Sequence, residues 1–86
     1  MESYRLLFKR SVTKDLRAIP QAAVARLLER IQGLAAEPRP PGCEKLSAQE
    51  RYRVRVGRYR IVYEIRDRDL VVLIVKVADR KDVYRR

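Results

Sequence analysis

Arginine recurs along one short stretch of this sequence at a spacing that concentrates positive charge. Residues 50 to 65 read ERYRVRVGRYRIVYEI, with arginine at 51, 53, 55, 58 and 60. Alternate residues of a β-strand point to the same face, so Arg51, Arg53 and Arg55 share one face if the stretch is extended. Guanidinium groups held side by side on a rigid strand can make bidentate hydrogen bonds to phosphate oxygens. The pattern therefore favours a phosphate-binding site, with a solvated, aggregation-resistant strand face as the alternative.

The composition of the whole chain also indicates a polyanionic partner. Its 86 residues include 21 Lys and Arg against 11 Asp and Glu, which gives a net charge of +10. Such a balance is typical of proteins that bind nucleic acid, an anionic membrane or an acidic protein. Apolar residues make up 47% of the chain, which argues against wholesale disorder. We expect one domain spanning residues 1–86.

The cysteine and histidine content and the hydropathy of the chain argue against several classes of protein. The chain has one cysteine, Cys43, and no histidine, which effectively excludes a structural zinc site. No cofactor is expected. A single cysteine cannot form an internal disulfide, which fits the reducing cytoplasm. No apolar run approaches the roughly 18 residues of a spanning helix, and the basic residues do not line an amphipathic helix. A membrane role is therefore the least favoured.

The first half of the chain predicts one strand and two helices. Residues 4–9 alternate between apolar and polar, as in a strand with one buried face. Ser11 is placed to cap a short helix, and Pro20 suits the first turn of a second helix. The apolar stripe of that second helix continues at helical spacing until EPRPPG, residues 37–42, which ends it.

The second half predicts three strands joined by tight turns. The strands are residues 52–56, 59–66 and 70–78, and the last is rich in β-branched residues, as in a central strand. Gly57 at the first turn position favours a type II′ hairpin. A three-residue turn at 67–69 joins the last two strands. The expected fold is α+β: an N-terminal strand, a helical hairpin, then a three-strand antiparallel meander, with the helices packed on one sheet face.

The hairpin turn fixes which side chains face each other. Arg55 is expected opposite Arg60, and Arg51 opposite Glu64; the three-residue turn then places Arg60 opposite Lys76. In this register Arg55, Arg60 and Lys76 have no carboxylate partner. Like charges directly opposite in a sheet destabilise it by up to roughly 1 kcal/mol each. The helices are expected to cover the other face, formed by Tyr52, Val54, Val56, Tyr59, Ile61, Tyr63, Ile65, Val71, Leu73, Val75 and Val77.

The C-terminal residues add cations and an aromatic ring to this basic face. Arg80, Lys81 and Tyr84 follow the last strand and can fold over it. An aromatic ring beside cations can stack on a base while its phosphate is held. The alternative for Tyr84 is packing against the sheet edge.

Four stretches together resemble a known family. LFKRSVTKDLRAIP, LLERIQGLAAEPRPPG, EKLSAQERYRVRVGRYRIVYEI and VVLIVKVADRKDVYRR are similar to the RelE toxins of the RelE/ParE superfamily, the toxin halves of type II toxin–antitoxin pairs. The resemblance runs from Tyr4 to Arg85. RVRVGRYRIVYEI and DVYRR are its most specific parts.

The resemblance implies a metal-free endoribonuclease. RelE toxins cleave mRNA in the ribosomal A site, where the ribose 2′-OH attacks the adjacent phosphate and leaves a 2′,3′-cyclic phosphate and a 5′-OH. It therefore implies a cognate antitoxin, the ribosome and mRNA as partners. By position, the catalytic set is Arg55, Arg60, Arg80 and Tyr84. The expected RNA-binding residues are Arg53, Arg51, Lys45, Lys76 and Lys81.

One departure from the family concerns acid–base chemistry. The best-studied pattern has lysines where this chain has Arg53 and Arg55, and one of those lysines is thought to be the general base. Arginine is effectively always protonated, so it can stabilise a phosphate but is a poor base. The candidates for proton transfer are Tyr84, Glu44, Glu50, Lys45 and Lys81, or the RNA and solvent.

Two other functions stay open at this point. One is a ParE-like toxin, which shares the fold but inhibits DNA gyrase. The other is a catalytically weak RNA-binding relative, which the arginine-for-lysine departure keeps in view. The presence of Arg60, Arg80 and Tyr84 favours the nuclease over the gyrase inhibitor.

Overall fold

Five strands and two helices build the protein in a computed structural model that describes residues 3–46 and 50–79. In chain order they are β1 (Arg5–Phe8), α1 (Arg10–Arg17), α2 (Gln21–Ala36), β2 (Glu44–Lys45), β3 (Arg51–Val56), β4 (Tyr59–Arg66) and β5 (Val71–Asp79), with a short 3-10 turn at Asp67–Asp69. The strands form one sheet in the order β1-β5-β4-β3-β2. The predicted α+β architecture is confirmed.

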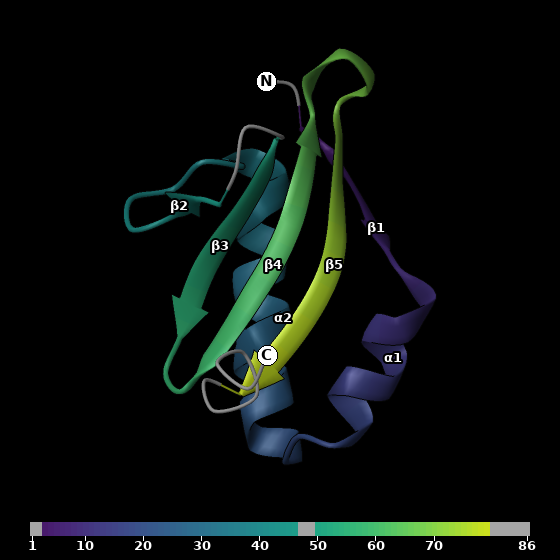
Figure 1. Ribbon diagram of the computed structural model, residues 1–86, viewed down its shortest axis with the longest axis vertical. Helices are drawn as coiled ribbons and strands as arrows, with labels where there is room; N and C mark the ends of the chain where they lie inside the picture. Colours follow the sequence, from purple (N-terminus) through teal and green to yellow (C-terminus); the bar gives the residue numbers. More distant parts are fainter. Residues whose placement is uncertain (1–2, 47–49, 80–86) are drawn as a thin grey trace.

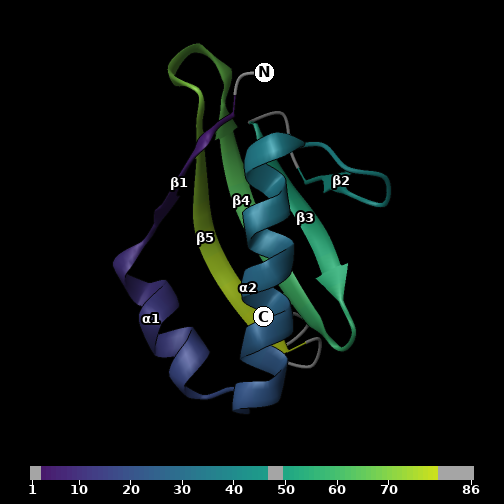
Figure 2. The same cartoon turned by 180° about the vertical axis from the view of Figure 1, so that it is seen from behind.

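The helices lie on one side of the sheet. α2 crosses the face of β3, β4 and β5, and α1 lies beside the C-terminal half of β5 (Figures 1 and 2). β1 pairs in parallel with β5, so β5 lies between β1 and β4 as the expected central strand. The opposite face, named here the arginine face, carries Arg51, Arg53, Arg55 and Arg60. No helix of the described residues is long and apolar enough to cross a membrane.

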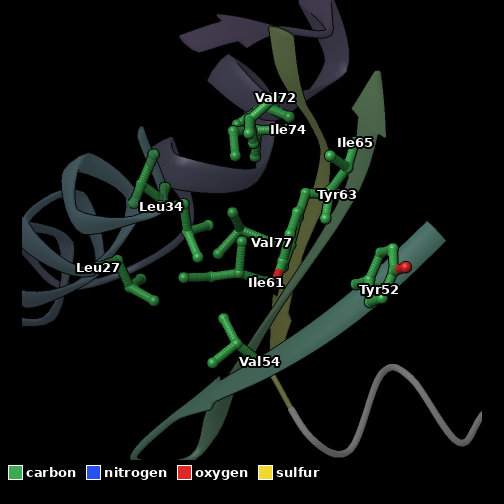
Figure 3. Packing of buried hydrophobic residues seen from close by; sticks show 12 residues of the cluster. Leu27, Leu34, Tyr52, Val54, Ile61, Tyr63, Ile65, Val72, Ile74 and Val77 are labelled. Carbon is green, nitrogen blue, oxygen red and sulfur yellow. The ribbon is translucent and has the colours of Figure 1, made fainter. Parts of the chain in front are cut away.

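Apolar side chains from both helices and three strands fill the space between the layers. Leu27, Ile31 and Leu34 come from the predicted stripe of α2, and each is at most 1% exposed. They pack on the sheet residues Val54, Ile61, Tyr63, Ile65, Val72, Ile74 and Val77 (Figure 3). Burial of these side chains is the main force that holds α2 to the sheet.

The predicted register of β5 is wrong by one residue from Val71 to Ile74 and by two residues from Lys76 to Asp79. Leu70 adopts the left-handed conformation with φ 54°, so the turn before β5 has four residues, 67–70, instead of three. Val72 and Ile74 therefore join the core in place of Val71, Leu73 and Val75. An irregularity of the ladder between Val62 and Tyr63 restores the predicted inward position of Val77.

The starts of α1 and α2 differ from the prediction, whereas the turn at Gly57 agrees with it. α1 begins at Arg10, before Ser11, and no side chain caps its first turn. Pro20 is the N-cap of α2 and lies just outside the helix. Gly57 has φ 59° and Arg58 does not have a positive φ, which fits the predicted type II′ turn.

Candidate nucleic-acid site

Three rows of side chains cross the arginine face from strand to strand. They are Arg51, Glu64 and Leu73; Glu44, Arg53, Val62 and Lys76; and Arg55, Arg60 and Ala78. The pairing of β3 with β4 is the one that the sequence predicts, because the two-residue turn at Gly57 and Arg58 fixes it. The face therefore presents cations from β3 and β4 in a fixed geometry.

Arg55 and Arg60 are directly opposite each other on neighbouring strands. Side chains at such positions start about 5 Å apart at Cβ, so two positive charges are held close together on this face. Arg60 is buried, with 2% of its surface exposed, whereas Arg55 is exposed. Within the described residues Arg55 forms no ion pair, so it remains available to an anionic ligand.

Arg51 is held by the partner that the sequence predicts. Its Nη2 lies 2.5 Å from Oε2 of Glu64, whose other oxygen lies 3.3 Å from Nη2 of Arg66. The hydrogen bond from Arg51 holds the pKa of Glu64 below its ordinary value. The carboxylate thus stays ionised at neutral pH, and Arg51 serves the sheet as a fixed cation.

β2, which the sequence does not predict, brings a carboxylate to the arginines. Glu44 pairs with Arg53 across the ladder, and its carboxylate accepts a hydrogen bond from the Arg53 guanidinium. That hydrogen bond, and then the positive charges of Arg53, Arg55 and Arg60, lower the pKa of Glu44. Of the proton-transfer candidates in the described residues, Glu44 is the one that lies among these three arginines. A two-residue strand has no periodicity, so pattern alone does not predict this position.

The structure places Lys76 differently from the predicted register. Lys76 is opposite Val62, and Ala78 takes the predicted place beside Arg60, because the turn and the ladder irregularity shift β5. Its Nζ lies 3.6 Å from Oδ1 of Asp15 in α1, so the expectation that Lys76 lacks a carboxylate partner is wrong. Lys76 is still on the arginine face, one row from Arg60.

Lys45 lies away from the arginine row. It is opposite Tyr52, whose side chain is in the core, and its ammonium group lies 3.2 Å from Glu50. Arg80, Lys81 and Tyr84 fall outside the described residues. Within residues 3–46 and 50–79, no group of three or more His, Cys, Asp or Glu side chains could hold a metal ion.

Arg39 anchors the loop that leads into β2, and sequence reasoning did not single it out. Its guanidinium lies 2.9 Å from carboxylate oxygens of both Glu50 and Asp67, and its Nε donates to the Tyr52 hydroxyl at 3.1 Å. Next to it, the Tyr63 hydroxyl donates to the backbone oxygen of Pro38 at 2.7 Å. The loop is thereby attached to the sheet just before Glu44. An arginine between prolines carries no sequence signal for such a role.

Comparison with known proteins identifies the group to which this fold and site belong. A family model described as the ParE toxin of the type II toxin–antitoxin system parDE matches residues 6–84. The chain belongs to the RelE/ParE superfamily of toxins. It is 32% identical over 85 residues to toxin RelG of Mycobacterium tuberculosis, covering 96% of this chain and 98% of that one. It is 31% identical over 80 residues to putative toxin RelE1 of Methanocaldococcus jannaschii, covering 86% and 87%.

Solved structures agree with this assignment. The RelE–RelB complex of Pyrococcus horikoshii matches with a TM-score of 0.81 and 34% identity, over 90% of this chain and 94% of that one. The isolated RelE toxin of Escherichia coli matches with a TM-score of 0.78 over 88% and 83% of the two chains, but at 22% identity it supports the fold alone. This chain is therefore a RelE-family toxin of the type II toxin–antitoxin class.

Proposed function

We propose that this RelE-family toxin is an endoribonuclease that cleaves mRNA in the ribosomal A site, in the cytoplasm. The observation that carries the proposal is the cross-strand pair Arg55 and Arg60, with Glu44 close enough for both charges to lower its pKa. Two guanidinium groups and one carboxylate are the groups that a metal-free attack on phosphate needs: charge stabilisation and a proton acceptor.

In the proposed reaction the ribose 2′-oxygen attacks the adjacent phosphorus. The bond from phosphorus to the 5′-oxygen of the next nucleotide breaks, and the leaving 5′-oxygen takes a proton from solvent. The products are a 2′,3′-cyclic phosphate and a 5′-OH. Arg55, which is exposed, contacts the non-bridging oxygens, and the positive charge of buried Arg60 beside it helps to stabilise the charge that grows on them. Because arginine stays protonated at any physiological pH, this stabilisation needs no proton transfer. We assign Arg80 to the same phosphate and Tyr84 to stacking on a base.

Glu44 is our proposal for the general base. Its lowered pKa keeps the carboxylate ionised, so it can accept the proton of the 2′-OH. A lowered pKa also makes it a weak base, so the arginines contribute more than the proton transfer does. When phosphate binds Arg53 and Arg55, it competes for their positive charge, which raises the basicity of Glu44 at the moment of reaction.

The test is cleavage of a ribosome-bound message by purified protein, with new 5′ ends mapped by primer extension. Glu44→Gln should lower the cleavage rate by about 100-fold to 10,000-fold, the usual contribution of a general base. Arg55→Gln should lower it by at least as large a factor, because charge stabilisation contributes more than proton transfer here. The matched control is Arg66→Gln, which removes an exposed arginine of β4 that pairs with Glu64. It should change the cleavage rate by less than about threefold.

The Glu44 variant also distinguishes two roles for this carboxylate. If Glu44 only occupies the phosphate position in the free protein, Glu44→Gln should cleave faster than wild type. That result would refute its role as base. Intact messages with wild-type protein would refute the nuclease proposal itself, and inhibition of gyrase supercoiling would replace it with the ParE-like alternative.

We also propose that the partner of this toxin is an antitoxin encoded beside it. Similar chains from Pyrococcus horikoshii and Mycobacterium tuberculosis were solved as toxin–antitoxin complexes. An acidic segment of such a partner would neutralise the arginine face. Co-expression with the product of a neighbouring small reading frame should yield a stable complex, and Arg55→Glu should weaken it while Arg66→Glu does not.

A further inference from the structure

The strand that carries Glu44 is too short to fix its own position. β2 has two residues, both exposed, and it lies beside β3 at the edge of the sheet (Figure 1). Its pairing places Glu44 opposite Arg53 and Lys45 opposite Tyr52. So short a ladder is marginal in water, because it gains few hydrogen bonds for the backbone entropy that it loses. Contacts outside β2 must therefore hold it on the sheet.

One guanidinium attaches the chain before β2 to two points of the sheet. Nη2 of Arg39 lies 2.9 Å from Oε1 of Glu50, which directly precedes β3. The same Nη2 lies 2.9 Å from Oδ2 of Asp67, and Nη1 lies 3.3 Å from Oδ1 of that residue. Asp67 directly follows β4. The Arg39 side chain therefore fastens the approach to β2 to the start of β3 and to the end of β4.

Two tyrosines fix the orientation of this guanidinium. Tyr52 is 7% exposed, and the guanidinium carbon of Arg39 lies over its ring, 5.2 Å from the centroid. The Tyr52 hydroxyl accepts a hydrogen bond from Nε of Arg39 at 3.1 Å and donates one to Glu50 at 2.9 Å. The Tyr4 hydroxyl donates to Asp67 at 2.7 Å. These five side chains, named here the Arg39 clasp, hold one another in a fixed arrangement.

The Arg39 clasp contributes more to position than to global stability. The side chains of Arg39, Glu50 and Asp67 are 41%, 47% and 50% exposed. Ion pairs as exposed as these add little to the free energy of unfolding, because water screens their charges. Three partners at once nevertheless fix the direction of the guanidinium plane, which a single ion pair does not. We therefore expect loss of the clasp to loosen β2 while the rest of the fold persists.

The pKa of Glu44 reports on the position of β2. The hydrogen bond from Arg53 lowers this pKa most, followed by the positive charges of Arg53, Arg55 and Arg60. Both effects weaken as the distance between the groups grows. A β2 that moves away from β3 would therefore return the pKa of Glu44 toward its ordinary value of 4.5.

We propose that Arg39 is a positioning residue that keeps β2 on the sheet and so holds Glu44 beside Arg53. Its consequence for cleavage rests on the proposed function, in which Glu44 accepts the proton of the 2′-OH. The position of Glu44 is a property of the free protein and does not rest on that function. Loss of the clasp displaces the proton acceptor, and a misplacement of about 1 Å can cost about 100-fold in rate.

The experiment measures the pKa of Glu44 by NMR titration of its carboxyl carbon in the free, full-length chain. Its signal is identified by its loss in Glu44→Gln. A second readout is hydrogen exchange of the Leu46 amide, which follows β2 and donates to the backbone oxygen of Arg51 at 2.9 Å. The variant is Arg39→Gln. The matched control, Arg68→Gln, removes the same charge from the exposed turn before β5 and breaks no ion pair of the described residues.

In Arg39→Gln the pKa of Glu44 should rise toward its ordinary value, and the Leu46 amide should exchange at least about tenfold faster than in wild type. Arg68→Gln should match wild type in both readouts. Asp15→Ala is a second control, because it removes a contact between α1 and β5 and lowers global stability without touching β2. It should leave the pKa of Glu44 unchanged.

Two results would overturn the proposal. One is a wild-type pKa of Glu44 in Arg39→Gln, which would mean that β2 keeps its position without the clasp. The other is an equal rise in Asp15→Ala, which would mean that global stability sets the position of Glu44.

Arg39→Lys separates geometry from charge. Lysine keeps the positive charge but presents one ammonium group in place of a planar fork, so it cannot reach the three partners of the guanidinium together. The pKa of Glu44 should therefore rise in Arg39→Lys as it does in Arg39→Gln. A wild-type pKa in the lysine variant would mean that charge alone positions β2, and the bridging role would be wrong.

Cleavage of a ribosome-bound message connects the position of Glu44 to function. Arg39→Gln should cleave about 10-fold to 100-fold more slowly than wild type, and Arg68→Gln should stay within about threefold. If the wild-type protein does not cleave, the nuclease proposal fails and the pKa of Glu44 still decides the role of Arg39. If that pKa rises while cleavage keeps its wild-type rate, Arg39 positions Glu44 as proposed but Glu44 is not the base.

Discussion

Asp15 offers a sharp test of how α1 is held to the sheet. β1 pairs with β5 only as far as Ile74, so beyond that point no strand of residues 3–46 or 50–79 borders this edge of β5. Oδ2 of Asp15 fills this gap by accepting a hydrogen bond from the backbone N–H of Val77 at 3.1 Å. Its Oδ1 lies 3.6 Å from Nζ of Lys76. One carboxylate thus replaces a missing ladder bond and neutralises a cation.

The two contacts have different weights. Val77 is 2% exposed, so losing its acceptor leaves a buried donor unsatisfied at a cost of about 1–3 kcal/mol. The side chain of Lys76 is 55% exposed, so its ion pair contributes only about 0–1 kcal/mol after solvent screening. Asp15→Ala should therefore lower the free energy of unfolding by about 2–3 kcal/mol. Asp15→Asn keeps an acceptor oxygen and should lower it by less than about 1 kcal/mol.

Urea denaturation followed by circular dichroism measures both values, and thermal unfolding should show a Tm loss of about 4–8 °C per kcal/mol for a domain of this size. Asp69→Ala, in the exposed turn before β5, is the control and should stay within about 0.5 kcal/mol of wild type. If Asp15→Asn costs as much as Asp15→Ala, the charge matters and the backbone hydrogen bond does not. If neither costs more than the control, the account of the β5 edge is wrong.

Two further predictions concern the sheet and its carboxylates. Tyr63→Phe keeps the buried ring but leaves the backbone oxygen of Pro38 without the hydrogen bond that it accepts at 2.7 Å. The free energy of unfolding, measured in urea, should therefore fall by about 1–2 kcal/mol. An unchanged urea midpoint would contradict this. The carboxyl groups of Glu64 and Asp67 each accept a hydrogen bond from a guanidinium, and this bond lowers their pKa below the ordinary values of 4.5 and 3.8. The stability that these two groups contribute is therefore complete above about pH 4.5. It is lost as the pH falls through their lowered pKa values. A Tm series from neutral to acid pH should show this loss, and it should flatten in Glu64→Gln/Asp67→Asn; an equally steep loss in that variant would assign it to other groups.

The regular part of the fold follows from sequence because one signal governs each element. The stripe that contains Leu27, Ile31 and Leu34 repeats at helical spacing, and the hairpin at Gly57 has the one residue that its turn requires. That turn fixed the pairing of β3 with β4, and so the meeting of Arg55 and Arg60. Where a local rule determines the geometry, pattern reasoning succeeds.

The register of β5 could not be predicted because two irregularities act on it. Leucine rarely adopts a left-handed conformation, so the sequence gives no reason to extend the turn to Leu70. The break in the ladder at Val62 and Tyr63 likewise has no glycine or proline to mark it. The pairings of Glu44 with Arg53 and of Asp15 with Lys76 depend on tertiary packing and leave no trace in local spacing.

The structure explains how the sheet tolerates neighbouring arginines without an RNA ligand. Arg51 is fixed by Glu64, whose side chain is 23% exposed and which also pairs with Arg66. Arg53 is paired with Glu44, whose side chain is 58% exposed, so that contact is well solvated and easily exchanged. Along β3, Arg51 is therefore held in a partly buried ion pair, Arg53 is in a solvated ion pair that a ligand can replace, and Arg55 forms no ion pair within the described residues. In the proposed reaction, a phosphate that enters at Arg55 meets no ion-paired carboxylate of the described residues there and takes Arg53 from Glu44. That exchange would free Glu44 to accept the proton of the 2′-OH.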